Sequence, residues 1–446
     1  MRLDLYLRAY PQNAKVKFGG GRDDSSDFQM KDIESRGGSM RIAQINMMHL
    51  GSTGTLMFSI AEKARQAGHE VWTFSPHYYQ RRASANFPEI PGHQYYGTAF
   101  ENMLHLRLSQ VTGLQGCFSV LGTAQLLRQL DRIQPEVIHL HNLHNWTINL
   151  PMLFAYIKRK KIRVIWTLHD CWAFTGQCAH FTMCKCDKWK TGCGECSQIH
   201  VYPQTFVDRT AIMWKKKRQW FSKAEDLTFV TPSRWLADLV RQSFLASYPV
   251  RVINNGIDLS VFSKNQGTFR KKHQLEEKKI VLGVAFDWGT RKGLDVFLHL
   301  AELLDDTYQI VLVGINEVLN RELPPRILSI RRTADRRKLA EIYSSADVFV
   351  NPTREDTFPM VNIEALACGT PVITFRTGGS PESLNATCGS VVDCDDIESM
   401  FREIERVCNE ACYSAEACRR RAEQFDQNVI FEEYVRLYEE RQKGTL

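Results

Sequence analysis

Two successive sets of short apolar segments constrain the fold of this chain more than any other feature of the sequence. The first set comprises residues 41–46, 70–74, 136–140, 163–168 and 227–231. The second set comprises residues 279–284, 309–313, 347–351 and 371–375. Short apolar runs that alternate with helix-length segments are typical of parallel sheets covered by helices. The sequence therefore predicts an α/β fold made of two doubly wound, Rossmann-like domains.

The predicted boundary between the domains is the turn-rich segment NNGIDLSVF, residues 254–262. Residues 1–39 are rich in Gly, Ser and Asp and predict a flexible extension. We expect the first domain at 40–262, the second at 263–427, and a last segment at 428–446. In such sheets ligands bind at the carboxyl ends of the strands, so the site is predicted in the cleft between the domains.

The sequence lacks the run of ~18 apolar residues that a membrane-spanning helix needs. Asp4 and Arg8 also interrupt the apolar N-terminal stretch that a signal peptide would require. We therefore expect a cytoplasmic protein. Its 13 cysteines are then expected to be reduced thiols or metal ligands rather than disulfides.

The segment NPTREDTFPMVNIEALACGTPVI, residues 351–373, carries the most information about chemistry. A strand leads through an acidic loop into a helix that is predicted to open near Val361. Backbone amide groups and the helix N-terminus would face a diphosphate in the stretch that comprises Thr357, Phe358, Pro359 and Met360. Glu364 could reach two hydroxyls of a ribose, and Asp356, eight residues earlier, could lie at the sugar of the same ligand.

This string resembles the signature of retaining glycosyltransferases of family 4, which have the GT-B fold and serve in bacterial surface polysaccharide synthesis. The ending EALACGTPVI matches that family closely, and the resemblance extends over residues 40–442. It implies that Asp356 contacts hydroxyls of the transferred sugar and that Glu364 binds the ribose. The chain departs from the family in having Asp at 356 where Glu is usual, so Glu355 is an alternative source of the carboxylate.

Two cations, Arg291 and Lys292, follow a strand in the segment GVAFDWGTRKGL. Positive side chains in this place can neutralise a diphosphate leaving group without a metal. The resembling family has the same Lys-Gly pair, which supports Lys292. It places its arginine several residues upstream, so the assignment of Arg291 rests on the residues of this chain alone.

Glycines and histidines mark the same edge of the first domain. Gly51 and Gly54, after the first strand, allow the backbone to approach a phosphate or sugar, and they match the glycine loop of the resembling family. His169 ends a strand in TLHDCW, and the resemblance implies that it contacts the donor sugar. Three further histidines are expected to line the acceptor side, with a zinc site as the alternative: His139, His141 and His144.

Five cysteines are concentrated in the predicted loop 171–200: Cys178, Cys184, Cys186, Cys193 and Cys196. A structural zinc site could be completed by Cys178, Cys186, Cys193 and Cys196. Free thiols or a redox-sensitive pair are the alternatives. Four thiolates would leave no open position on the metal, so such a zinc would stiffen the loop only.

The acidic triplet of Asp393, Cys394 and Asp395 imitates the metal-binding DxD of another glycosyltransferase fold. The triplet runs directly into an amphipathic helix. Asp395 or Asp396 is therefore interpreted as the residue that caps this helix.

Basic residues gather in two clusters, at 158–161 and at 215–218. The second cluster lies between Trp214 and Trp220 on a helix predicted at 209–221, which would suit the surface of an anionic bilayer. A solvated helix face is the alternative. RNA binding would require both clusters to form one face, and no nucleic acid is expected as a partner.

Together these features predict a glycosyltransferase that moves a sugar from a nucleotide diphosphate donor, with a UDP-sugar favoured, to a saccharide or lipid-linked saccharide at the inner face of the membrane. Family membership implies retention of configuration, attack by the acceptor from the leaving-group side, and no catalytic cofactor. It also implies that a last helix, 428–442, crosses back to the first domain. The alternatives are a non-catalytic nucleotide-sugar-binding or assembly protein and a GT-B nucleotide-sugar epimerase.

Overall fold

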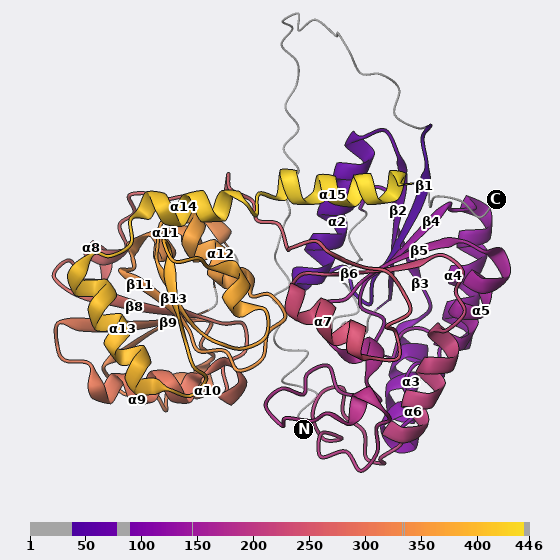
Figure 1. Ribbon diagram of the computed structural model, residues 1–446, viewed down its shortest axis with the longest axis horizontal. Helices are drawn as coiled ribbons and strands as arrows, with labels where there is room; N and C mark the ends of the chain where they lie inside the picture. Colours follow the sequence, from indigo (N-terminus) through magenta and orange to yellow (C-terminus); the bar gives the residue numbers. More distant parts are fainter. Residues whose placement is uncertain (1–37, 78–89, 145, 332, 334, 441–446) are drawn as a thin grey trace, which may run out of the picture.

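A computed structural model describes residues 38–77, 90–144, 146–331, 333 and 335–440. The predicted extension at 1–39 therefore lies almost wholly outside the described residues. Figure 1 shows two α/β domains side by side, each built on a sheet flanked by helices. All strands of the first sheet precede the predicted boundary segment 254–262 in the sequence, and all strands of the second sheet follow it.

The first domain contains a seven-stranded sheet in the order β3-β2-β1-β4-β5-β6-β7, and every pairing in it is parallel. Its strands are β1 Arg41–Ile45, β2 Glu70–Pro76, β3 His93–Tyr96, β4 Val137–Leu140, β5 Arg163–Thr167, β6 Leu227–Thr231 and β7 Val250–Val252. Its helices are α2 Gly51–Gln66, α3 Ala99–Thr112, α4 Val120–Ile133, α5 Leu150–Lys160, α6 Thr210–Phe221 and α7 Arg234–Gln242. The strand order reverses between β1 and β4, which opens a ligand crevice at their carboxyl ends.

The second domain contains six parallel strands in the order β10-β9-β8-β11-β12-β13. The strands are β8 Lys279–Val284, β9 Tyr308–Val313, β10 Ile327–Ile330, β11 Val348–Asn351, β12 Val372–Phe375 and β13 Gly389–Val392. The helices are α8 Phe269–His273, α9 Leu294–Leu303, α10 Glu317–Asn320, α11 Arg336–Ser345, α12 Met360–Ala367, α13 Ile397–Glu410 and α14 Ala415–Glu423. This order also reverses, between β8 and β11, so the crevices of the two domains can serve one ligand.

The strands that sequence reasoning missed are the edges of the two sheets. All nine predicted strands are present, and their ends differ from the prediction by no more than two residues. The four missed strands are β3, β7, β10 and β13, each of which lies at an edge. Edge strands are only partly buried here, so they carry no continuous apolar run.

The last helix, α15 Gln427–Glu439, crosses back from the second domain and lies beside α2, as predicted (Figure 1). Its buried face joins the core beneath the first sheet through Ile430, Phe431, Tyr434, Val435, Leu437 and Tyr438. The Arg163 guanidinium on β5 donates to the carbonyls of Leu437 and Tyr438, both at 2.8 Å. Val429 on the same helix is 59% exposed, whereas Ile430 directly after it is buried.

Candidate active site

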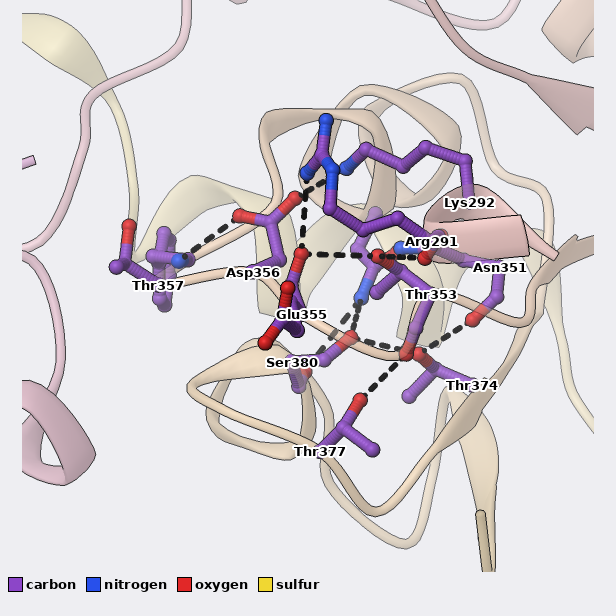
Figure 2. A network of polar contacts seen from close by, with 12 residues as sticks. Arg291, Lys292, Asn351, Thr353, Glu355, Asp356, Thr357, Thr374, Thr377 and Ser380 are labelled. Carbon is purple, nitrogen blue, oxygen red and sulfur yellow. Dashed lines mark hydrogen bonds and ion pairs between the residues drawn. The ribbon is translucent and has the colours of Figure 1, made fainter. Parts of the chain in front are cut away.

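The donor loop, residues 352–359, joins β11 to α12 and carries the predicted acids. Asp356 of this loop forms an ion pair with Lys292, with 2.6 Å between the lysine Nζ and the carboxylate Oδ2. Burial raises the pKa of the Asp356 carboxyl, but the charges of Lys292 and Arg291 outweigh burial and hold that pKa below its usual range. Figure 2 shows both cationic side chains turned toward this loop. The structure therefore brings the predicted cations and the predicted sugar-binding acid together.

Backbone contacts hold the two cations against the donor loop. The Arg291 guanidinium donates to the carbonyl of Glu355 at 3.3 Å, and the amide of Arg354 donates to the carbonyl of Arg291 at 2.9 Å. Gly293 follows with a φ of +73°, and a Cβ there would meet the Pro352 carbonyl oxygen at 2.5 Å. A side chain at this position would push the cations away from the loop, which explains the glycine after Lys292.

Two adjacent glycines, Gly378 and Gly379, were missed by sequence reasoning and pack against the donor loop. A Cβ on Gly378, which has a φ of +55°, would meet the Asp356 carbonyl oxygen at 1.9 Å. The amide of Gly379 donates to that same oxygen at 3.1 Å. The signal in the sequence was the Gly-Gly pair that begins three positions after the end of a predicted strand.

A buried polar network fixes the start of the loop and the start of α12 (Figure 2). Asn351 donates through Nδ2 to Asn362 Oδ1 at 2.7 Å, and Asn362 donates to the Ser380 hydroxyl at 3.2 Å. Thr374 shares a hydrogen bond of 2.6 Å with the same Ser380 hydroxyl. These residues are almost fully buried, so the network is shielded from water and holds one arrangement of the loop.

Glu364 lies one turn inside α12, which begins at Met360, one residue before the predicted position. Its Oε2 accepts a hydrogen bond of 3.0 Å from the hydroxyl of Tyr343 on α11. Burial raises the pKa of Glu364, although the bond from Tyr343 opposes that shift. Tyr343 thus orients the predicted ribose-binding acid, and sequence reasoning did not find it. The Phe358 side chain is buried against Phe425, so its predicted contact with a diphosphate concerns its backbone only.

His169 follows β5 and touches the donor loop from the first domain. The Thr357 hydroxyl donates to the His169 carbonyl at 3.0 Å. The imidazole Nε2 lies 3.3 Å from Nδ1 of His141. Burial lowers the pKa of His169 to about 4, so the ring is neutral at physiological pH. The structure therefore places this predicted residue at the cleft, as a neutral group that can bond a sugar hydroxyl.

The predicted role of the other histidines as an acceptor-side lining is wrong for two of them. His139 on β4 and His141 directly after it are fully buried, because β4 is a central strand of the first sheet. The His139 ring bridges Tyr438 on α15 and Thr167 on β5, at 2.6 and 2.8 Å. His144 is held by Asp170, with 2.8 Å between Nε2 and Oδ2.

Gly51 and Gly54 lie in the first turn of α2, directly after β1 and its loop. A Cβ on Gly54 would meet the backbone carbonyl of His49 at 2.5 Å. Close packing of the helix against this loop accounts for Gly54 without a ligand. Contact of these glycines with the donor stays a prediction.

Glu355 and Asp356 point to different partners, which separates the two candidate acids. Oε1 of Glu355 accepts hydrogen bonds from the Thr182 hydroxyl at 3.0 Å and from the Met183 amide at 2.8 Å. Both donors belong to the Cys-rich loop of the first domain. Asp356 alone pairs with Lys292, so the geometry favours Asp356 as the acid at the sugar.

The cysteines of the Cys-rich loop, residues 171–200, are free thiols, as are the other cysteines of the chain. Burial raises the pKa of Cys193 to about 11, and three other thiols of the zinc candidate set act on the pKa of Cys178: Cys186, Cys193 and Cys196. Across the described ranges, no group of three or more His, Cys, Asp or Glu side chains is arranged to hold a metal ion. A structural zinc at the four thiols stays a prediction.

The basic helix α6 is only partly the surface helix that was expected. Trp214 is buried, and its indole donates to the Trp189 carbonyl at 2.8 Å. Lys217 is fully buried as well. The Cys-rich loop covers this face of α6, which removes these two residues from any membrane surface.

Asp396 caps α13, as predicted, and accepts a hydrogen bond of 2.9 Å from the Ser399 amide. Asp395 pairs with the guanidinium of Arg354 at 2.7 Å. The triplet that imitates a metal motif thus precedes the helix cap, and its two acids, Asp393 and Asp395, form ion pairs with Arg376 and Arg354.

Comparison with known proteins agrees with this geometry. The profile described as Glycosyltransferase Family 4 matches residues 53–261, and that described as Glycosyl transferases group 1 matches residues 265–425. The two profiles together span both domains and the cleft residues of each. The chain is a family 4 glycosyltransferase with the GT-B fold.

The glycosyltransferase is similar over its length to a curated relative and to solved structures. It is 27% identical to the putative colanic acid biosynthesis glycosyl transferase WcaC of Escherichia coli, over 90% of this chain and 100% of the relative. It resembles the sucrose-phosphate synthase of Thermosynechococcus elongatus with a TM-score of 0.64 and 17% identity, over 90% and 98% of the two chains. It resembles Anabaena HepE in complex with UDP-glucose with a TM-score of 0.61 and 13% identity, over 90% and 99%.

This membership decides among the functions considered from the sequence. The enzyme is a hexosyltransferase-type glycosyltransferase that uses a nucleotide-sugar donor. The sensor and epimerase interpretations are therefore set aside.

Proposed function

We propose that this glycosyltransferase transfers a sugar from a UDP-sugar to a lipid-linked saccharide, with retention of configuration, in surface polysaccharide assembly. The observation that carries the proposal is the pairing of Lys292 with Asp356 beside the start of α12. UDP and UDP-glucose are the ligands named for HepE, and a Campylobacter jejuni relative, 26% identical over 49% of this chain and 61% of its own, is named for a diphospho-undecaprenol acceptor.

The ion pair suggests how the site changes when a donor binds. A diphosphate at the helix start would take Lys292 as its counter-ion, and the freed Asp356 carboxylate would accept hydrogen bonds from sugar hydroxyls. Glu364 would hold the ribose, positioned by Tyr343. Arg291 and Lys292 would stabilise the charge that develops on the leaving diphosphate, without a cofactor.

In the proposed reaction, the acceptor hydroxyl forms a bond to the anomeric carbon as the bond to the diphosphate oxygen breaks. The new bond forms on the face that the leaving group departs from, which retains the configuration. The hydroxyl proton passes to the leaving diphosphate. Asp356 then serves to bind the sugar rather than to attack it.

The test is hydrolysis and transfer across a panel of UDP-, GDP- and ADP-sugars, followed by mass spectrometry. Wild type is compared with Glu364→Ala, Lys292→Ala and the exposed control Lys271→Ala. We expect wild type and Lys271→Ala to turn over one UDP-sugar, and we expect Glu364→Ala and Lys292→Ala to lose that turnover. Turnover of a GDP- or ADP-sugar instead would overturn the UDP assignment. Wild-type turnover by Glu364→Ala would overturn the assignment of the site.

We also propose that the first domain contacts an anionic bilayer, where a lipid-linked acceptor would be found. An apolar stripe on α3 is exposed and continues onto the start of α4 and the segment before α6: Phe100, Met103, Leu104, Val111, Val120, Leu121, Phe206 and Val207. The amide of Phe206 donates to the Gln110 carbonyl at 2.8 Å, which joins that segment to α3. Arg107 on α3 and Arg209 beside Gly113 add positive charge. None of the helices in the described ranges is long and apolar enough to cross a membrane.

Co-sedimentation with vesicles of phosphatidylglycerol and phosphatidylcholine tests this contact. We expect Phe100→Ser with Leu121→Ser to reduce binding to the anionic vesicles several-fold. The matched control is Val318→Ser, which replaces a 65% exposed apolar residue of the second domain. Equal binding by both variants would exclude this face as the contact.

A further inference from the structure

The backbone of the Cys-rich loop is fixed close to the end of β5. The amide of Cys171 donates to the carbonyl of Ala179 at 2.9 Å. The buried Lys217 ammonium on α6 donates to the carbonyls of Trp172 and Thr175, at 2.7 and 3.0 Å. These bonds close the first part of the loop, so the residue after Ala179 has a defined position.

The loop is fixed again directly beyond that residue, this time to the other domain. Phe181 is buried among the aromatic rings of the loop. The Thr182 hydroxyl and the Met183 amide then bond the Glu355 carboxylate across the cleft. His180 therefore lies between two anchored points, one on each domain.

Charged groups of both domains surround the His180 side chain. Asp170 belongs to the end of β5, Arg291 to the cation pair, and Glu355 and Asp356 to the donor loop, and all four interact electrostatically with the imidazole. Burial, followed by the charge of Arg291, lowers the pKa of His180, which favours the neutral ring. A neutral imidazole offers one donor and one acceptor, the pair that sugar hydroxyls can match.

The ring is half-buried, and within the described part of the chain it makes no hydrogen bond to protein. Its neighbours on both sides are held in place, so the ring has a defined position without a hydrogen bond of its own. A polar ring in such a place, next to the predicted sugar-binding acid, has an unused capacity to bind a ligand.

We propose that His180 is a substrate-binding residue that contacts the transferred sugar, and that the Cys-rich loop serves to present it. This inference rests on the proposed function, because it takes the donor to lie along Lys292, Asp356 and Glu364. It adds the Cys-rich loop to the site, which so far comprised the donor loop with its cations and His169 at the end of β5. It also assigns a use to the cysteine cluster that does not depend on a metal.

The experiment compares UDP with UDP-glucose, or with the matching pair for the donor that the panel selects. Affinities are measured by calorimetry for wild type, His180→Ala, His180→Asn and the control His200→Ala, which removes an exposed histidine of the same loop. We expect His180→Ala to weaken the nucleotide sugar about tenfold per hydrogen bond lost and to leave UDP unchanged. Asparagine, which keeps a donor and an acceptor, should restore part of the loss.

Three outcomes would overturn the inference. Equal loss of UDP and sugar-nucleotide affinity, with a lower melting temperature, would assign His180 a structural role. Wild-type affinity in His180→Ala would show that the ring does not touch the sugar. An effect on the Michaelis constant for the acceptor alone would move the contact to the other substrate. In each case turnover by wild type would leave the proposed function standing, whereas absence of any turnover would remove both.

Discussion

The Lys292 ammonium and the Asp356 carboxylate neutralise each other across 2.6 Å in the protein without ligand. Each charge offsets part of the desolvation cost of the other, and under the proposed function each would become available when a diphosphate displaces the pair. Asp replaces the usual Glu here, and the structure shows that the shorter side chain still reaches the lysine. The neighbouring Glu355 is used to join the two domains.

Asp356→Asn tests this division of roles. We expect donor hydrolysis to fall about 100-fold, since the amide binds sugar hydroxyls less well than a carboxylate does, while UDP affinity does not fall because Lys292 is released. The measurement is steady-state hydrolysis together with UDP titration. Glu355→Gln should give the smaller loss, and the reverse order would assign the sugar to Glu355.

Lys217 presents a different case, because a fully buried ammonium is expensive. Burial lowers its pKa to about 7, and its ring contact with Trp172 lies at 3.4 Å. Lys217→Met would leave the carbonyls of Trp172 and Thr175 without their donor, so we expect a loss of about 1–3 kcal/mol in the free energy of unfolding. Urea denaturation measures it. Lys216→Met on the same helix is the control, and an equal effect of both would contradict the expectation.

Helix α15 links the chain's end to its first sheet, and it shows how one element carries both packing and polar contacts. Six of its side chains enter the core below the first sheet, and its Tyr438 hydroxyl reaches the buried ring of His139. The helix, which follows the second domain in sequence, thus packs against the first domain and connects the two. A hydrogen bond at this depth is shielded from water, so its removal leaves a buried nitrogen unpaired.

Tyr438→Phe removes only the hydroxyl. We expect unfolding to become easier by about 1–3 kcal/mol, because His139 loses one partner in a buried site. Thermal or chemical denaturation followed by circular dichroism would measure it. Val429→Ala on the exposed side of the same helix should change stability by less than about 0.5 kcal/mol. Comparable losses in the two variants would argue against the buried bond.

At the scale of the whole molecule, three sets of bonds hold the domains across the cleft. Thr357 bonds the His169 carbonyl, and Glu355 bonds the Cys-rich loop. On α7, the amides of Arg234 and Trp235 both donate to the Glu382 carboxylate at 2.8 Å. Glu382 therefore supplies from the second domain the negative charge that the start of α7 favours.

Buried histidines make the stability of the molecule depend on pH. Burial lowers the pKa of His93, His105 and His139 to about 3. Between pH 6.5 and about 3 the unfolded chain binds protons that the folded chain does not, so this stability is present above pH 6.5 and is lost as the pH falls. We expect each to contribute a slope of about 1.4 kcal/mol per pH unit in that window.

Urea unfolding at several values from pH 7.5 down to pH 4.5 measures this slope. His105→Asn should reduce this slope by the contribution of about one proton, since the His105 ring is buried beside Ser119. A free energy of unfolding that stays constant over the range would contradict the buried neutral state.

The sequence by itself determined the central strands, the donor loop and its cations, and the glycosyltransferase family. These features are local: a strand buried on both faces must be a continuous apolar run, and a phosphate-binding turn needs its residues in order. The edge strands escaped because their partial burial leaves no such run. Trp214 and His139 were misplaced because a local pattern cannot report which neighbouring element covers a side chain.

Only the tertiary structure showed which partner each candidate acid contacts and that the Cys-rich loop touches the donor loop. Thr182 and Glu355 are separated by 173 residues in sequence, yet their bond removes Glu355 from competition with Asp356. The same fold brings His180 to the cleft. Such choices depend on the packing of two separately formed domains, and the free energy that selects them comes from contacts that no single segment contains.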